Sequence, residues 1–162
     1  MTEKGYLACI DFFSRRPRLQ KAAIILQKLC EALMYAAYPL FILWLIVDGN
    51  GLWWRSLLVC GLGFIAVTLL RLRLNAVRPY EKFGFAPLIK KDKKGQSFPS
   101  RHAFSAAVIA VNVGVYCLPL GILLGAVALA IAFLRVVLGV HFIRDVAFGI
   151  IAGVAIGLIV LI

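Results

Sequence analysis

The sequence predicts an all-α fold, a polytopic membrane helix bundle of about five transmembrane helices with an N-terminal surface segment. Of the 162 residues, 63% are hydrophobic and only 15% are charged, which is far too apolar for a soluble domain of this size. The apolar residues also fall into runs close to the roughly 20 residues that a helix needs to cross a bilayer. A chain of this length is expected to form a single membrane-embedded domain over residues 1–162.

The chain divides into an arm, five apolar segments and one long polar loop. Residues 1–21 mix aromatic and basic side chains and are too polar to cross a bilayer, so we expect an interfacial arm along the membrane surface. Residues 71–102 form the long polar stretch, expected outside the bilayer with a short helix near residues 80–85. The expected spans are 22–47, 52–70, 103–118, 120–134 and 142–162.

Helices that alternate in direction gather the polar residues at their ends on one membrane face. This face receives the end of the second span, the start of the third, the end of the fourth and the start of the fifth. The polar residues at these ends are Arg71, Arg78, Ser100, Arg101, His102, Arg135, His141 and Asp145. The topology therefore predicts one site, built around the 71–102 loop.

The charge balance indicates an anionic partner. The formal net charge is +11, an excess that suits nucleic acid, anionic lipid headgroups or phosphorylated substrates. Because the spans are so apolar, we expect membrane lipids and a lipid phosphate as partners, and no nucleic acid.

Arg71 and Arg78 form the first candidate constellation. They lie seven positions apart, so on a continuing helix they project from nearly the same face. Pro79 disfavours helix at the residue before it, so we expect that helix to end at Arg78. Two guanidinium groups are a natural phosphate clamp, although basic residues at the end of a span also commonly extend to lipid headgroups.

His141 and Asp145 form the second, at positions i and i+4 of the fifth span. Asp145 can accept a hydrogen bond from one imidazole nitrogen and leave the other as an oriented nucleophile. Alone, such a pair is equally consistent with a structural contact between helices. Arg135 precedes His141 by six residues, across a turn that contains Gly139.

Together these residues resemble the type 2 phosphatidic acid phosphatase superfamily, whose motifs run Lys-x6-Arg-Pro, Pro-Ser-Gly-His and Ser-Arg-x5-His-x3-Asp. The corresponding stretches here begin at Arg71, Pro99 and Leu134, and both long spacings are kept. The resemblance covers residues 71–145. It implies a membrane phosphatase of lipid phosphates or diphosphates, of the phosphatidate, phosphatidylglycerol phosphate or polyprenyl phosphate type.

The resemblance also implies residue roles. His141 would form a phosphohistidine, His102 would act as acid and then base, and Asp145 would orient His141. The phosphate-binding residues would be Arg71, Arg78, Ser100, Arg101 and Arg135. The family uses no metal or other cofactor, so none is expected here.

Three positions depart from the family pattern. Arg71 replaces a lysine and keeps the positive charge, Arg101 replaces a glycine and brings a large side chain to the site, and Leu134 replaces a serine. Two other functions fit parts of the pattern: a non-catalytic binder or transporter of anionic lipids, and vanadate-dependent haloperoxidase chemistry. The first leaves the two histidines unexplained, and relatives that perform the second are typically soluble.

The distribution of basic residues predicts the orientation. Of the 18 Lys and Arg residues, Arg55 alone falls on the face opposite the motifs. The positive-inside rule then places the N-terminus and the active site on the cytoplasmic face of the cell membrane. Many family members have an additional N-terminal span and act on the outer face, so this expectation conflicts with the family analogy.

Overall fold

The computed structural model describes residues 1–89 and 94–162, and this part of the chain contains helices and no strand. The basic cluster of the long loop lies partly at residues 90–93, outside the described residues. The helices are α1 (Glu3–Ser14), α2 (Pro17–Val47), α3 (Trp53–Leu74), α4 (Pro79–Phe83), α5 (Arg101–Tyr116), α6 (Leu118–Val137), α7 (Ile143–Gly157) and the short 3-10 helix η1 (Leu158–Leu161).

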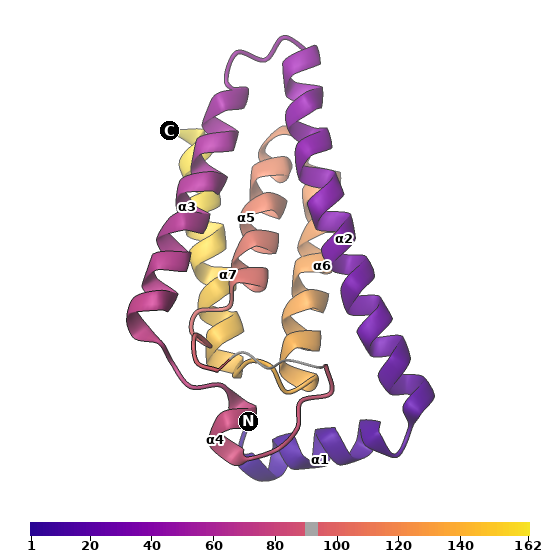
Figure 1. Cartoon of the computed structure of the whole chain (residues 1–162). Coiled ribbons are helices and arrows are strands. Elements are labelled where there is room, and N and C mark those ends of the chain that lie inside the picture. The colour runs from indigo at the N-terminus through magenta and orange to yellow at the C-terminus, as the bar shows by residue number, and fades with distance from the viewer. Residues whose placement is uncertain (90–93) are drawn as a thin grey trace.

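The bundle is built around α5, which packs most extensively on α7 and α6 and also contacts α2 and α3 (Figure 1). Four stretches are long and apolar enough to cross a membrane: Pro17–Val47, Trp53–Phe83, Leu118–Val137 and Ile143–Leu161. The expected third span corresponds to α5, which has 16 residues and runs among the other helices. The prediction of a polytopic helical membrane bundle is confirmed.

Glycines let α7 approach α5 closely. A Cβ atom added at Gly149 would lie 2.7 Å from the carbonyl oxygen of Ser100, and one at Gly153 would lie 2.6 Å from that of Phe104. The two backbones meet at the start of α5, where the Ser100 amide donates to the carbonyl of Asp145 over 2.9 Å. This contact fixes the residues that begin α5 against those that begin α7.

The N-terminal arm runs across the end of the bundle as α1 (Figure 1). Its Tyr6 is fully buried against Phe83, Phe85 and Phe142, and the Tyr6 hydroxyl donates to the carbonyl of His141 over 3.1 Å. The long helix α2 begins at Pro17, earlier than the expected boundary at residue 22, because proline suits the first turn of a helix. The arm is thus shorter than 1–21 and is attached to the loop before α7.

The 71–102 stretch differs from its prediction in one respect. The helix that carries Arg71 ends at Leu74, where Asn75 adopts a left-handed conformation, so Arg78 is not on the same helix. Arg78 is extended and caps the short helix α4, which starts at Pro79 close to the expected position. Residues 94–100 lead into α5 at the same end of the bundle (Figure 1).

Candidate active site

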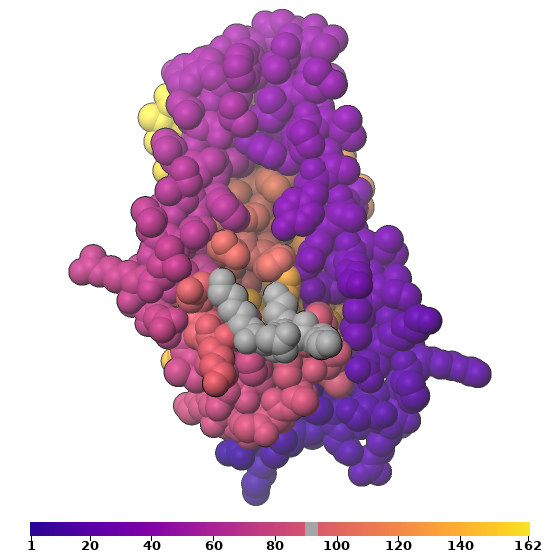
Figure 2. Space-filling view, in the orientation of Figure 1, coloured from indigo at the N-terminus to yellow at the C-terminus, as the bar shows by residue number. Residues whose placement is uncertain are grey.

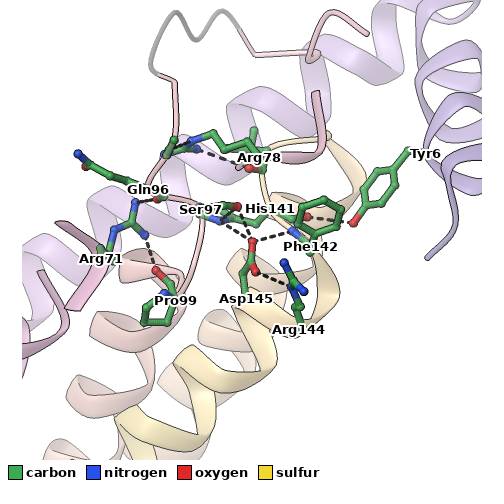
Figure 3. Close-up of polar contacts among 12 residues, drawn as sticks. Tyr6, Arg71, Arg78, Gln96, Ser97, Pro99, His141, Phe142, Arg144 and Asp145 are labelled. Carbon is green, nitrogen blue, oxygen red and sulfur yellow. Dashed lines mark hydrogen bonds and ion pairs between the residues drawn. The ribbon is translucent and has the colours of Figure 1, made fainter. Parts of the chain in front are cut away.

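His141, Asp145 and Ser97 form the centre of the site (Figure 3). The carboxylate oxygen Oδ2 of Asp145 lies 3.5 Å from Nδ1 of His141 and accepts a short hydrogen bond from the Ser97 hydroxyl. The Ser97 hydroxyl is itself 3.5 Å from Nδ1 of His141. All three side chains are buried. One ring nitrogen of His141 is therefore held by Asp145 and Ser97, which leaves Nε2 for chemistry.

Asp145 caps helix α7, so His141 and Asp145 do not form the expected i, i+4 pair on one helix. Helix α7 starts at Ile143, so His141 lies in the loop before it. Asp145, in the first turn, accepts from the backbone N–H of Phe142 over 3.0 Å. A carboxylate is favourable at a helix N-terminus, where backbone N–H groups lack partners. The same oxygen thus caps α7 and faces His141.

His141 is neutral near pH 7. Burial lowers its pKa to about 4, and the nearby charges of Arg78 and Arg135 act in the same direction, against the contact with Asp145 that raises it. A neutral imidazole keeps a lone pair on one ring nitrogen, as a nucleophile must.

Three buried arginines surround this centre. Arg71 donates to the backbone carbonyls of Gln96 and Pro99, and Arg78 donates to those of Gly95 (2.9 Å) and Val140 (3.5 Å). The structure therefore brings both Arg71 and Arg78 to carbonyls of the Gly95–Pro99 backbone. Arg135 reaches the site from the last turn of α6, and its backbone carbonyl accepts from the N–H groups of Val140 and His141, which folds the Gly139 turn back as expected.

Two buried polar atoms of the predicted phosphate site have no hydrogen-bond partner within the described residues: Oγ of Ser100 and Nε of Arg135. Such atoms are costly to bury unless they bind something. Both can donate a hydrogen bond. They therefore suit an anion that brings several acceptor oxygens.

His102 and Arg101 face a cavity of about 140 Å³ that is also lined by Glu31, Tyr35, Phe64 and other residues, most of them on α2, α3 and α5. A second cavity, of about 260 Å³, lies between the same helices and shares Met34, Tyr35, Phe64, Ser105 and Ile109 with the first. Figure 2 shows this hollow between α2 and α3, with α5 visible at its floor. Within the described residues no three His, Cys, Asp or Glu side chains are grouped as a metal site requires.

The sequence model of the PAP2 superfamily matches residues 52–162, more than half of the chain. The chain belongs to the PAP2 superfamily. It is accordingly a phosphatase, as the resemblance in the sequence implied.

Two solved structures are similar to this one. Aquifex aeolicus LpxE is 26% identical, with a TM-score of 0.72 over 90% of this chain and 87% of that one. The first transmembrane PAP2 type phosphatidylglycerolphosphate phosphatase from Bacillus subtilis is 23% identical, with a TM-score of 0.55 over 96% and 90%, which shows the shared fold. A search of curated proteins finds no match.

The structure shows what surrounds two of the residues that depart from the PAP2 pattern. Leu134 is buried in an apolar cluster with Leu88, Leu138 and Val140, so a hydrophobic residue suits this position. The Arg101 guanidinium lies 5.6 Å from the centre of the Phe64 ring and rims the cavity, a position that cation–π attraction favours.

Three residues that contact the site were not among those predicted. Ser97 contacts Asp145 and His141, Tyr6 contacts the His141 carbonyl, and Glu31 contacts Arg135 and His102. Tyr6 and Glu31 lie outside the residues that the PAP2 model matches. An acidic residue inside an apolar span was the available signal for Glu31, because such residues are rare unless they are paired or functional.

Proposed function

We propose that this PAP2 protein hydrolyses a lipid phosphate or diphosphate through a phosphohistidine on His141, without a metal ion. The observation that carries the proposal is the buried His141, held at Nδ1 by Asp145 and Ser97, next to the unpartnered donors of Ser100 and Arg135. A fixed nucleophile beside unused hydrogen-bond donors is the arrangement that transfer of a phosphoryl group requires.

In the first step Nε2 of His141 attacks phosphorus in line with the leaving oxygen. The N–P bond forms as the P–O bond to the leaving group breaks, and His102 gives its proton to the leaving oxygen. In the second step water attacks phosphorus, the P–N bond breaks, and His102 takes a proton from the water. Inorganic phosphate leaves, and both histidines return to their starting protonation states.

Binding of the phosphate is assigned to Arg71, Arg78, Ser100, Arg101 and Arg135. Arg71 and Arg78 donate to backbone carbonyls in this structure, and phosphate oxygens are stronger acceptors than carbonyl oxygens. We expect these guanidinium groups to turn from loop carbonyls to the equatorial phosphate oxygens, where charge accumulates in the transition state.

The substrate class follows from the surroundings of His102. The two cavities with shared lining residues connect the polar end of the bundle to an apolar hollow between α2 and α3. A phosphate on an apolar tail matches this change from polar to apolar lining. The solved relatives include a phosphatidylglycerolphosphate phosphatase, and phosphatidate and polyprenyl phosphates have the same amphiphilic character.

The test is phosphate release in detergent from phosphatidate, phosphatidylglycerol phosphate and a polyprenyl diphosphate, each assayed with wild type and His141→Ala. We expect wild type to release phosphate from at least one lipid and His141→Ala to lose at least about 10³-fold in rate. Lys82→Ala, at an exposed cation on the same end of the molecule, is the control. Saturable binding of these lipids without any phosphate release would instead indicate a binder or transporter.

We also propose that the site faces the cytoplasm. This orientation is supported by the bias of Lys and Arg in the sequence, where Arg55 alone falls on the face expected opposite the motifs. In a background without the four native cysteines, Lys82→Cys should resist a membrane-impermeant maleimide in intact cells, whereas Asp48→Cys in the turn between α2 and α3 should react. The reverse labelling pattern would overturn the orientation.

A further inference from the structure

Glu31 brings a negative charge to a site that binds anions. It lies on α2, outside the part of the chain that the PAP2 model matches. One carboxylate oxygen, Oε1, accepts from a guanidinium nitrogen of Arg135 over 2.7 Å and from the amide of Gln27 over 2.8 Å, and it lies 3.8 Å from Nε2 of His102. Glu31 therefore contacts two residues from two different motifs.

A carboxylate at this place opposes phosphate binding, because like charges repel. Glu31 must therefore make a favourable contribution that offsets the weaker binding of the phosphate. Part of the offset concerns Arg135, which is 2% exposed and would otherwise be a buried charge without a counter-ion. The other part concerns His102, whose partly buried ring lines the cavity with Nε2 3.8 Å from the carboxylate of Glu31.

We infer that Glu31 is a positioning residue that holds His102 for proton transfer, in the way that Asp145 holds His141. The inference rests on the proposed function. In the protonated ring of His102, the N–H at Nε2 forms an ion pair with Glu31, and the N–H at Nδ1 donates to the leaving oxygen of the bound substrate. After that proton is given up, the lone pair on Nδ1 accepts a proton from the attacking water, while Nε2 keeps its hydrogen toward Glu31.

The arrangement makes Glu31 matter most for substrates that need a proton on the leaving group. An alkoxide leaving group requires protonation, whereas p-nitrophenolate leaves without it. Glu31→Gln keeps the size of the side chain and an acceptor for Arg135, but it removes the charge that holds the ring of His102. We expect this variant to lose about 10-fold to 100-fold in kcat on an alkyl phosphate lipid, and less than about 3-fold on p-nitrophenyl phosphate.

Inhibition by orthovanadate shows whether the anion site of a variant is still folded. Because Glu31→Gln removes a negative charge beside Arg135, vanadate should inhibit the variant as strongly as wild type or more strongly. Glu3→Gln, at an exposed carboxylate of α1, is the matched control and should behave as wild type with both substrates. In a His102→Ala background, adding Glu31→Gln should cause no further loss on the alkyl phosphate.

Equal loss on both substrates, or loss of vanadate inhibition, would show that Glu31 only maintains the structure of the site, and would overturn the inference. If Glu31→Gln does not fold, Glu31→Asp replaces it, and its loss must again be confined to the alkyl phosphate. A wild type that hydrolyses neither substrate contradicts the proposed function itself. A wild type that hydrolyses both, with Glu31→Gln unimpaired on the alkyl phosphate, contradicts this inference alone.

Discussion

Gly153→Ala tests whether the close packing of α5 on α7 sets the geometry of the site. The added Cβ would lie 2.6 Å from the carbonyl oxygen of Phe104 and 2.8 Å from Cβ of Ala107. Ordinary contacts of this kind begin near 3.4 Å, so α7 must move away from α5 by several tenths of an ångström or more. The two helices that move apart carry Asp145 and His102.

The magnitude follows from two opposing terms. Overpacking a well-packed interface costs about 1–3 kcal/mol, and replacing glycine with alanine in a helix gains up to about 1 kcal/mol. We therefore expect a net loss of about 1–2 kcal/mol in the free energy of unfolding. Activity should fall further, because a displacement of 1 Å among reacting groups can cost about 100-fold in rate.

The assay compares Gly153→Ala with Gly125→Ala in detergent, by thermal unfolding and by phosphate release. A Cβ added at Gly125, in α6, meets nothing within 4 Å, so this variant should be as stable as wild type or more stable, and fully active. If Gly153→Ala matched Gly125→Ala in both measurements, the reasoning that this helix contact positions the site would be refuted.

Four further outcomes are expected. Asp145→Asn should lower kcat by about 10³-fold to 10⁴-fold at unchanged fold, because an amide has no charge to stabilise the positive ring of His141 and its NH2 group can only donate. Retention of a tenth of the rate would argue against the orienting role. In His102→Asn, His141 is the remaining histidine, and an NMR titration of its ring should have its midpoint near pH 4 and not near 6.5. The stability that the neutral ring contributes should be lost as the pH falls from about 6.5 toward 4, because the unfolded chain takes up the proton first. Tyr6→Phe should lower the free energy of unfolding, measured by denaturation in detergent, by about 1 kcal/mol, because the carbonyl of His141 loses the hydrogen bond from Tyr6. An unchanged value would show that this contact of α1 does not stabilise the site. Orthovanadate should inhibit and EDTA should not, whereas activity lost on chelation and restored by Mg²⁺ would contradict the metal-free mechanism.

The sequence predicted the helical membrane bundle, its helix order and the end of the bundle at which the motif residues meet. These features follow from the lengths of the apolar runs and from the alternation of helix direction, which are local properties of the chain. The family motif added the spacing of Arg78, His141 and Asp145, and the structure brings these residues to one end of the bundle.

The sequence did not predict contacts that depend on the three-dimensional path of the loops. Arg78 was expected on the helix of Arg71, yet the left-handed conformation of Asn75 ends that helix earlier. Ser97 and Glu31 reach the site through chain reversals and helix packing that no sequence spacing records. Ser97 and Glu31 can be identified as site residues only once α2 and the long loop are placed against α5 and α7 in three dimensions.

Covalent phosphorylation of His141 is the step on which the proposed mechanism depends. The most direct measurement is rapid quenching of wild type with a radiolabelled lipid phosphate, followed by peptide mapping of the base-stable, acid-labile label. The mechanism predicts label on His141, with a larger amount retained in His102→Ala when the substrate has a good leaving group, because water attack is then slow. Label on His102 in place of His141, or continued turnover by His141→Ala, would contradict it.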